Sequence, residues 1–284
     1  MKRECFAETG FFGAAVLSAA LTALVLIFML IMGFPLFREG HFFTLLTTPW
    51  NPDKGLFGIY PMLTGTLSIV FLSLCWAFPL SLGASVLISV LAPPGFAKFC
   101  KKTVQMLTGI PTVIYGFVGV FLLVPFIREM FASGSGMSIF SASLMLSMVI
   151  SPTMIIIFTD TFESIPASFS TAADALGASP VQKLLYVILP YSRRGIFAGL
   201  VLSVGRAMGD TLIALMLAGN AVAFPGSILD SARTLTAHIA LVIAADFDSI
   251  EFKTIFAAGF VLYVLTTFFI LLVRIIGGTG MKNR

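Results

Sequence analysis

The sequence predicts an all-α membrane protein with six spanning helices, and three observations support this fold class. Of its 284 residues, 58% are hydrophobic and only 11% are charged, whereas a soluble domain carries about 25% charged residues. The mean hydropathy is +1.04, so most apolar side chains must face lipid. The few charged residues are separated by uncharged stretches long enough to cross a bilayer, which takes about 20 residues. A disordered chain, a nucleic-acid-binding domain and an ordinary soluble enzyme are therefore excluded.

The uncharged stretches define the predicted spans. No charged residue lies between Glu8 and Arg38, or between Lys54 and Lys98. The segment 235–245 is apolar but too short to span, so we expect an interfacial or re-entrant helix there. Residues 1–284 are expected to form a single transmembrane domain, with spans at about 11–34, 57–91, 104–127, 137–159, 195–222 and 254–276.

The basic residues predict the orientation, because Lys and Arg are enriched in the cytoplasmic loops of membrane proteins. Five basic residues fall on the outer side, namely Arg38, Lys54, Arg128, Arg233 and Lys253. Eleven fall on the inner side, namely Lys2, Arg3, Lys98, Lys101, Lys102, Lys183, Arg193, Arg194, Arg274, Lys282 and Arg284. We therefore expect both termini in the cytoplasm.

The segment 160–194 is the longest polar stretch on the predicted inner side. Pro166 and Gly177 are placed to start and end one helix, and Pro180 to start a second helix that Pro190 stops. A connecting loop of this length is uncommon unless it is functional. We expect a helix–turn–helix that docks on a soluble partner, with a plain connecting loop as the alternative.

Two charged residues, Arg206 and Asp210, fall inside the fifth predicted span. A charge there costs about 3 kcal/mol or more, and the i, i+4 spacing would let the two side chains pair on one helix face. One interpretation is a self-neutralising pair that fixes helix packing. The other is an anion relay, in which Arg206 binds an oxyanion through its planar fork of donors. Asp210 would then hold Arg206 in place between transport events.

No residue pattern indicates an enzyme. The chain lacks any Gly-Lys dipeptide and hence a Walker A phosphate loop, so energy must come from a partner or a gradient. Its two histidines, His41 and His238, are far apart, and its three cysteines lack metal-ligand spacing. We expect no catalytic residues, no metal and no cofactor bound by this chain, and the small net charge of +4 implies no nucleic acid partner.

The segment from Thr171 to Pro190 resembles the EAA loop of bacterial ABC importer permeases. Its family pattern is E-A-A, three residues, G, nine residues, I, one residue, L-P. The matching residues are Ala172, Ala173, Gly177, Leu189 and Pro190, whereas Thr171 stands in place of Glu and Val187 in place of Ile. This resemblance implies a type I (MetI-like) permease fold, with the loop, Thr171 included, seated on an ATPase subunit.

The residues around the charged pair resemble phosphate-specific (Pst) ABC permeases. Residues 205–211 read G-R-A-M-G-D-T and 218–220 read A-G-N, like the family's R-A-x-G-E-T…G-N, with Asp210 in place of Glu. The I-P-T-V-I-Y-G of 110–116 and the T-L-T-A of 234–237 also match. The G-N of 219–220 and the T-L-T-A run favour the PstC-like over the PstA-like half.

The Pst resemblance implies that Arg206 and Asp210 act in phosphate translocation. It also implies the cytoplasmic (inner) membrane and three kinds of partner: a second permease subunit, two ATP-binding subunits that use ATP, and an extracytoplasmic phosphate-binding protein. A permease for molybdate or sulfate is a close alternative, although those usually carry Phe where Thr211 stands. An ion-coupled secondary transporter is less favoured, because such folds often contain internal repeats and none is found.

Overall fold

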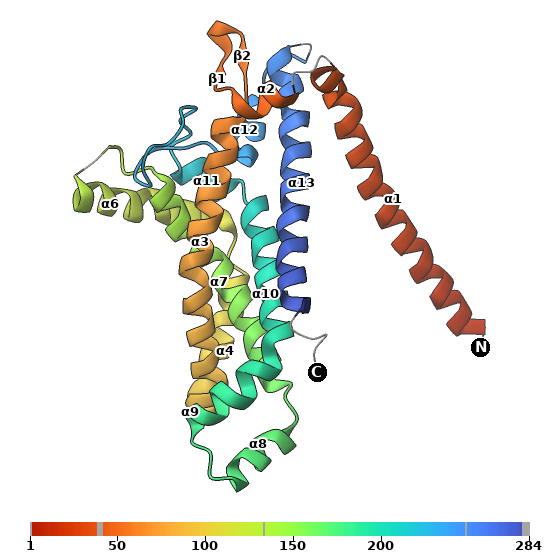
Figure 1. Ribbon diagram of the computed structural model, residues 1–284, viewed down its shortest axis with the longest axis vertical. Coiled ribbons are helices and arrows are strands. Elements are labelled where there is room, and N and C mark those ends of the chain that lie inside the picture. The colour runs from red at the N-terminus through yellow and green to blue at the C-terminus, as the bar shows by residue number, and fades with distance from the viewer. Residues whose placement is uncertain (1, 39–41, 133, 248, 280–284) are drawn as a thin grey trace.

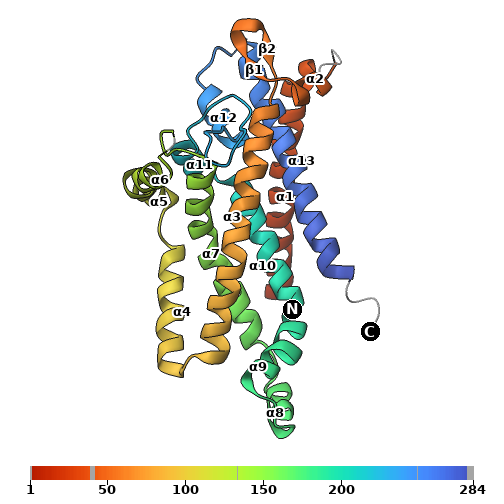
Figure 2. The ribbon, with the colours of Figure 1, turned by 60° about the vertical axis from the view of Figure 1, so that its left-hand side comes forward.

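The computed structural model describes residues 2–38, 42–132, 134–247 and 249–279. Six of the described helical segments are long and apolar enough to cross a membrane, which confirms the predicted all-α, six-span fold. Most long helices run along the long axis of the molecule (Figures 1 and 2), with α12 and a small hairpin at one end and α8 and α9 at the other. We refer to these as the α12 end and the α8 end.

The first half of the chain forms two spans joined by a hairpin at the α12 end. In order, its elements are α1 (Lys2–Arg38), α2 (Phe42–Thr47), β1 (Trp50–Asn51), the 3₁₀ turn η1 (Pro52–Lys54), β2 (Leu56–Phe57), α3 (Tyr60–Val86), the π-helical turn η2 (Leu87–Leu91) and α4 (Pro94–Thr108). The strands are antiparallel, with Trp50 opposite Phe57. Gly55 closes the turn between them in the left-handed conformation, with φ +69°.

The second half contains the remaining spans and the segment that joins them at the α8 end. Its elements are α5 (Thr112–Val118), the π-helical turn η3 (Gly119–Leu123), α6 (Val124–Phe131), α7 (Ile139–Glu163), α8 (Ala167–Ala175), α9 (Pro180–Lys183), the π-helical turn η4 (Leu184–Ile188), α10 (Leu189–Gly209), α11 (Leu212–Leu217), α12 (Leu235–Val242) and α13 (Ile250–Thr279). The short α12 lies where an interfacial or re-entrant helix was expected.

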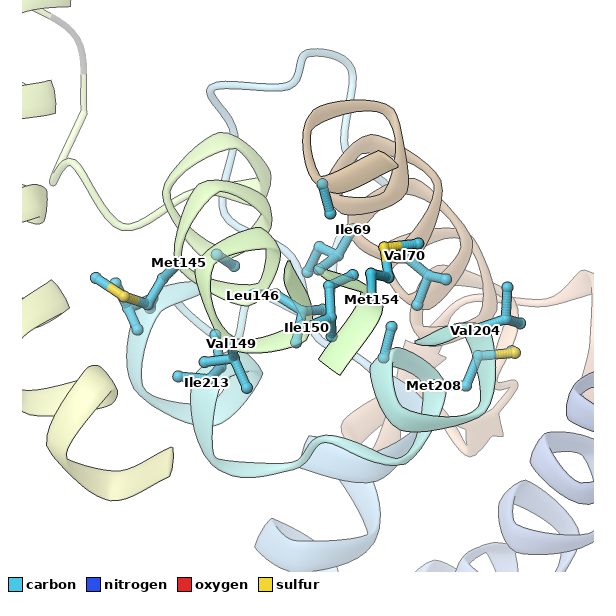
Figure 3. Packing of buried hydrophobic residues seen from close by; sticks show 14 of the residues in the cluster. Ile69, Val70, Met145, Leu146, Val149, Ile150, Met154, Val204, Met208 and Ile213 are labelled. Carbon is cyan, nitrogen blue, oxygen red and sulfur yellow. The ribbon is translucent and has the colours of Figure 1, made fainter. Parts of the chain in front are cut away.

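Helix α7 is the centre of the core. Its buried residues Met145, Ile150 and Met154 pack with Ile69 of α3 and Met208 of α10 (Figure 3). Apolar side chains supply most of this contact, but serines let the α3 and α7 backbones approach closely. The hydroxyl groups of Ser81 and Ser85 donate across the interface to backbone carbonyls of α7, each at 3.3 Å. Small hydroxyl residues commonly serve this purpose between membrane helices.

Helix α1 stands apart from this core. It contacts α13, where the rings of Phe28 and Phe256 meet edge to face at 5.6 Å, and diverges from the bundle toward the α8 end (Figure 1). Its apolar side chains are mostly exposed, Phe11 and Ile31 among them. This surface must therefore be covered by lipid or by another chain.

Two predicted spans are divided differently in the structure. The expected span 104–127 is interrupted between α4 and α5 at Gly109, Ile110 and Pro111, because proline lacks an N–H and disfavours helical backbone in the residue before it. The expected span 195–222 ends as a helix at Gly209 and resumes as the separate α11. Two of the basic residues assigned to the predicted inner side, Lys282 and Arg284, lie outside the described residues.

Candidate functional site

Arg206 lies in the last turn of α10, and its side chain is partly buried. Its Nη1 donates a hydrogen bond of 2.7 Å to the hydroxyl of Thr153 on α7. Thr153 is 14 residues from Ile139 at the α12 end of α7 and 10 residues from Glu163 at the α8 end, which is about 21 Å and about 15 Å along the helix. The guanidinium is thus anchored between α7 and α10, far from either end of the molecule.

Asp210 terminates α10. Its backbone is extended, with φ −74° and ψ 119°, so the chain leaves the helix at this residue. The carboxylate oxygen Oδ1 accepts a hydrogen bond of 2.8 Å from the backbone N–H of Ile213, in the first turn of α11. The Asp210 carbonyl accepts a second bond, of 3.1 Å, from the hydroxyl of Thr236. Asp210 therefore links α10, α11 and α12.

The predicted pairing of Arg206 with Asp210 is wrong. Within the part of the chain that the structure describes, the two side chains form no ion pair. Side chains at positions i and i+4 meet only on a continuous helix, but α10 ends at Gly209 and the Asp210 carboxylate turns toward α11. The hydrogen bond of the Arg206 side chain goes instead to the uncharged Thr153, and Asp210 acts on Arg206 only as a charge beyond ion-pair distance.

The segments 218–220 and 232–237, which follow Arg206 and Asp210 in the chain, lie side by side. The backbone N–H of Ala232 donates to the Ala218 carbonyl at 2.8 Å, and that of Asn220 to the Ala232 carbonyl at 3.1 Å. Gly219 has φ +82°, and a Cβ there would collide with Ser231, so glycine is required. The A-G-N run and the residues just before the T-L-T-A run thus form one structural unit.

Arg233, which precedes the T-L-T-A run, belongs to the same unit and was not singled out from the sequence. Its Nε donates to the Asn220 carbonyl at 3.1 Å. Its backbone carbonyl presses on Gly65 of α3, where no Cβ would fit. The next residue but one, Leu235, donates its N–H to the Thr66 hydroxyl at 2.9 Å. This part of the loop is therefore packed firmly onto α3.

His238 of α12 is fully buried in the same region. Its ring meets Trp50 edge to face at 4.5 Å, and its Nε2 lies 3.5 Å from the Thr254 hydroxyl. Among the described residues, Nδ1 has no hydrogen-bond partner. Burial, with a further contribution from the charge of Arg233, lowers the pKa of His238 to about 4, so the ring is neutral at pH 7.

The helix–turn–helix predicted within 160–194 is present at the α8 end as two helices and a tight turn. Gly177 has φ +73° and follows the C-cap of α8. Its N–H donates to the Asp174 carbonyl and that of Ala178 to the Ala173 carbonyl, the hydrogen bonds of a Schellman motif. Ser179 then forms a capping box at the start of α9. This confirms the expected helix punctuation, although α8 begins one residue after Pro166.

The exposed face of this loop is apolar and hollowed. Leu176 is 88% exposed and Tyr186 77% exposed. Between α8 and α9 lies a groove of about 540 Å³, lined by Ala172, Ala173 and Gly177 with seven neighbours. Thr171 is exposed on α8, and its hydroxyl bonds back to its own helix. A short ion pair of 2.6 Å between Lys183 and Asp174 joins the two sides of the groove.

Pro190 does not stop the second helix as predicted. The chain is helical from Pro180 to Gly209, and Leu189 and Pro190 lie at the start of α10. The π-helical turn η4 precedes them, and a turn of this kind widens the helix, where the ring of Pro190 would otherwise collide with a carbonyl one turn earlier. One side of the groove and Arg206 therefore lie on one continuous helical segment.

A second electrostatic contact braces the α8 end of α7. Lys101 of α4 lies 2.9 Å from Asp160 and 2.7 Å from Glu163 of α7. Burial alone would lower the pKa of Lys101, but the hydrogen bonds to the two carboxylates outweigh this and raise it. The contact fixes the last turn of α7, directly before the loop that leads into α8.

Comparison with known proteins identifies the family. Residues 101–278 match the family described as "Binding-protein-dependent transport system inner membrane component". The chain belongs to this family. The match includes Arg206, Asp210 and the whole segment 160–194, and it is consistent with the six apolar spans of a multi-pass membrane protein.

Several curated relatives are similar over most of the chain. The probable ABC transporter permease YqgH of Bacillus subtilis is 34% identical over 233 residues, covering 81% of this chain and 75% of the relative. The phosphate transport system permease PstC 2 of Mycobacterium tuberculosis is 30% identical, covering 86% and 82%. PstC of Pasteurella multocida is 29% identical, covering 77% and 74%.

Solved structures show the same fold. A bacterial alginate ABC transporter, in complex with its alginate-bound periplasmic protein, matches with a TM-score of 0.67 at 17% identity, covering 96% of this chain and 95% of that chain. The inward-facing MetNI methionine ABC transporter matches with a TM-score of 0.54 at 19% identity, covering 78% and 91%. The expected MetI-like permease fold is thereby confirmed.

Proposed function

We propose that this chain is a PstC-like permease subunit of an ABC importer that moves inorganic phosphate across the cytoplasmic membrane. The observation that carries the proposal is Arg206, a part-buried cation between α7 and α10 whose hydrogen bond goes to a neutral hydroxyl. A part-buried charge that forms no direct ion pair is only partly compensated, even though the charge of Asp210 acts on it from further away. A passing anion would supply that counter-charge, and the phosphate transport permeases among the relatives point to phosphate.

The chemistry of Arg206 suits this role. A guanidinium stays protonated and matches phosphate oxygens through a planar set of N–H donors. The bond to Thr153 uses Nη1 and leaves donors for a ligand. Asp210 has a different role from the one expected: it shapes the end of α10 and the start of α11 around the arginine. Its carboxylate also repels an anion, which keeps binding weak enough for release.

The α8 end supports the proposed partners. The apolar groove between α8 and α9 suits a helix or loop of an ATP-binding subunit, so ATP hydrolysis would occur on the partner and this chain would remain non-catalytic. This end would then face the cytoplasm, with both termini on the same side. An extracytoplasmic phosphate-binding protein would dock at the α12 end, and a second permease subunit would complete the pathway.

The test is phosphate uptake by cells that lack this gene, complemented with the parent chain, Arg206→Gln or the control Arg128→Gln, an exposed arginine of α6. We expect Arg206→Gln to lower uptake roughly 10- to 100-fold, because a charge-assisted bond contributes about 1.5–3 kcal/mol. The complex should still assemble, as judged by co-purification of the ATP-binding subunit, and Arg128→Gln should transport normally.

Three results would contradict the proposal. Parallel loss of assembly and uptake in Arg206→Gln would make the arginine structural. Uptake of molybdate or sulfate in place of phosphate would assign another oxyanion. Uptake that persists after deletion of the ATP-binding subunit would indicate an ion-coupled secondary transporter.

A further inference from the structure

Arg233 is, like Arg206, a cation that forms no ion pair with any described residue. It is half-buried in the loop before α12. Within the described residues it forms no ion pair, and its one hydrogen bond runs from Nε to the Asn220 carbonyl. A guanidinium has further N–H donors on its two terminal nitrogens. Those donors are available to a ligand.

Among the described residues, no carboxylate acts on the charge of Arg233, for which burial is the one influence found. His238, close enough to sense its charge, is neutral at pH 7. Thr234, the next residue, is the N-cap of α12, so the positive end of that helix dipole lies beside Arg233. A half-buried cation next to a helix N-terminus favours an anion from solution.

The geometry also fixes how an anion would bind. The Asn220 carbonyl occupies Nε, which leaves the end-on edge formed by the two terminal nitrogens. That edge can donate two parallel bonds to one oxyanion. The backbone of Arg233 is pressed against Gly65, so the side chain projects from a fixed base. Such a site is organised before the ligand arrives.

The two arginines lie at different depths. Gly65 is five residues, or about 7.5 Å, from Tyr60 at the α12 end of α3. Arg206 is anchored roughly 21 Å along α7 from that helix's α12 end. Thr236, three residues after Arg233, bonds to Asp210 at the end of the helix that carries Arg206. Of the two arginines, Arg233 thus lies nearer the α12 end, and Thr236 connects its loop to the helix that carries Arg206.

We propose that Arg233 is an outer station for the transported oxyanion, where the terminal guanidinium nitrogens hold phosphate before it reaches Arg206. The inference rests on the proposed function and extends it to a second residue. The station attracts the anion released at the α12 end. It binds weakly because it is half-exposed and water competes for the same donors.

The test measures phosphate uptake by the complete importer carrying Arg233→Lys, Arg233→Gln or Arg233→Cys. We expect the Gln and Cys variants to lose uptake about tenfold, the change that about 1.4 kcal/mol produces, and the Lys variant to retain most of it. Treatment of Arg233→Cys with positively charged 2-aminoethyl methanethiosulfonate should restore uptake several-fold, whereas the negatively charged sulfonatoethyl reagent should not. The parent chain treated in parallel controls for its own cysteines, of which Cys75 is exposed.

A second readout tests binding directly. In the parent complex, millimolar inorganic phosphate should slow the modification of Arg233 by phenylglyoxal, followed by mass spectrometry of the peptide that contains it, and the same concentration of chloride should not. Normal uptake by Arg233→Gln, or no restoration by the positive reagent, would overturn the inference. Loss of complex assembly in both neutral variants would also overturn it, because Arg233 would then only hold the loop. If Arg206→Gln is inactive while Arg233→Gln is normal, only this inference fails and the proposed function stands.

Discussion

Acid should destabilise the folded chain through His238. The pKa of this histidine falls from 6.5 to about 4 on folding, so the folded protein favours the neutral ring. The free energy of unfolding that the neutral His238 ring contributes is fully present above pH 6.5 and is lost as the pH falls from 6.5 toward 4. The two pKa values give a loss of roughly 2 kcal/mol at pH 5 and roughly 3 kcal/mol at pH 4.

The assay is thermal unfolding of the purified protein in detergent between pH 7.5 and pH 4.5, comparing the parent with His238→Gln. Glutamine keeps a polar atom near Thr254 but does not titrate. Fluorescence is a suitable signal because Trp50 touches the His238 ring. We expect the parent to lose stability more steeply below pH 6.5 than the variant. Identical pH dependence in both proteins would refute the argument that a neutral, buried ring underlies the effect.

Two further predictions concern glycines, each with a matched control. Gly199→Ala should lower the free energy of unfolding by about 1–3 kcal/mol, because its Cβ would lie 2.7 Å from the ring of Phe158. The control is Gly205→Ala, whose Cβ has room. This control should be neutral or stabilising in the same thermal assay. Gly177→Val should abolish co-purification of the ATP-binding subunit, because a side chain at φ +73° strains the α8 turn by about 1–2 kcal/mol. Gly55→Val imposes the same strain at the α12 end and should keep the subunit; equal loss in both variants would contradict a docking role for the loop.

Local features were predictable from the sequence because residues a few positions apart determine them. Gly177 ends its helix in the left-handed conformation and Ser179 caps the next one, and both effects act within one turn of backbone. The six spans followed from hydropathy for a similar reason, since an uncharged stretch of sufficient length has few alternatives to a spanning helix.

Features that depend on tertiary contacts were not predictable. The partner of Arg206 is Thr153, 53 residues earlier in the chain, and nothing in the sequence spacing distinguishes it from the other hydroxyl residues of α7. Continuity of the helix past Pro190 depends on a π-helical turn that relieves the proline, which the residue pattern does not reveal. Arg233 carried a weak signal, because it directly precedes the T-L-T-A run, but only the fold shows its lack of a counter-ion.

The two helices that hold Arg206 are the same two that flank the loop at the α8 end: α7 leads into the loop and α10 emerges from it. The loop connects these two helices at the α8 end, and the hydrogen bond between Thr153 and Arg206 connects them again further along. That bond is 2.7 Å long, and a separation greater by about 0.8 Å would exceed hydrogen-bonding range. A partner that binds the loop and moves α7 and α10 apart would therefore break the hydrogen bond to Arg206, and one that moves them together would restore it, without contacting the arginine.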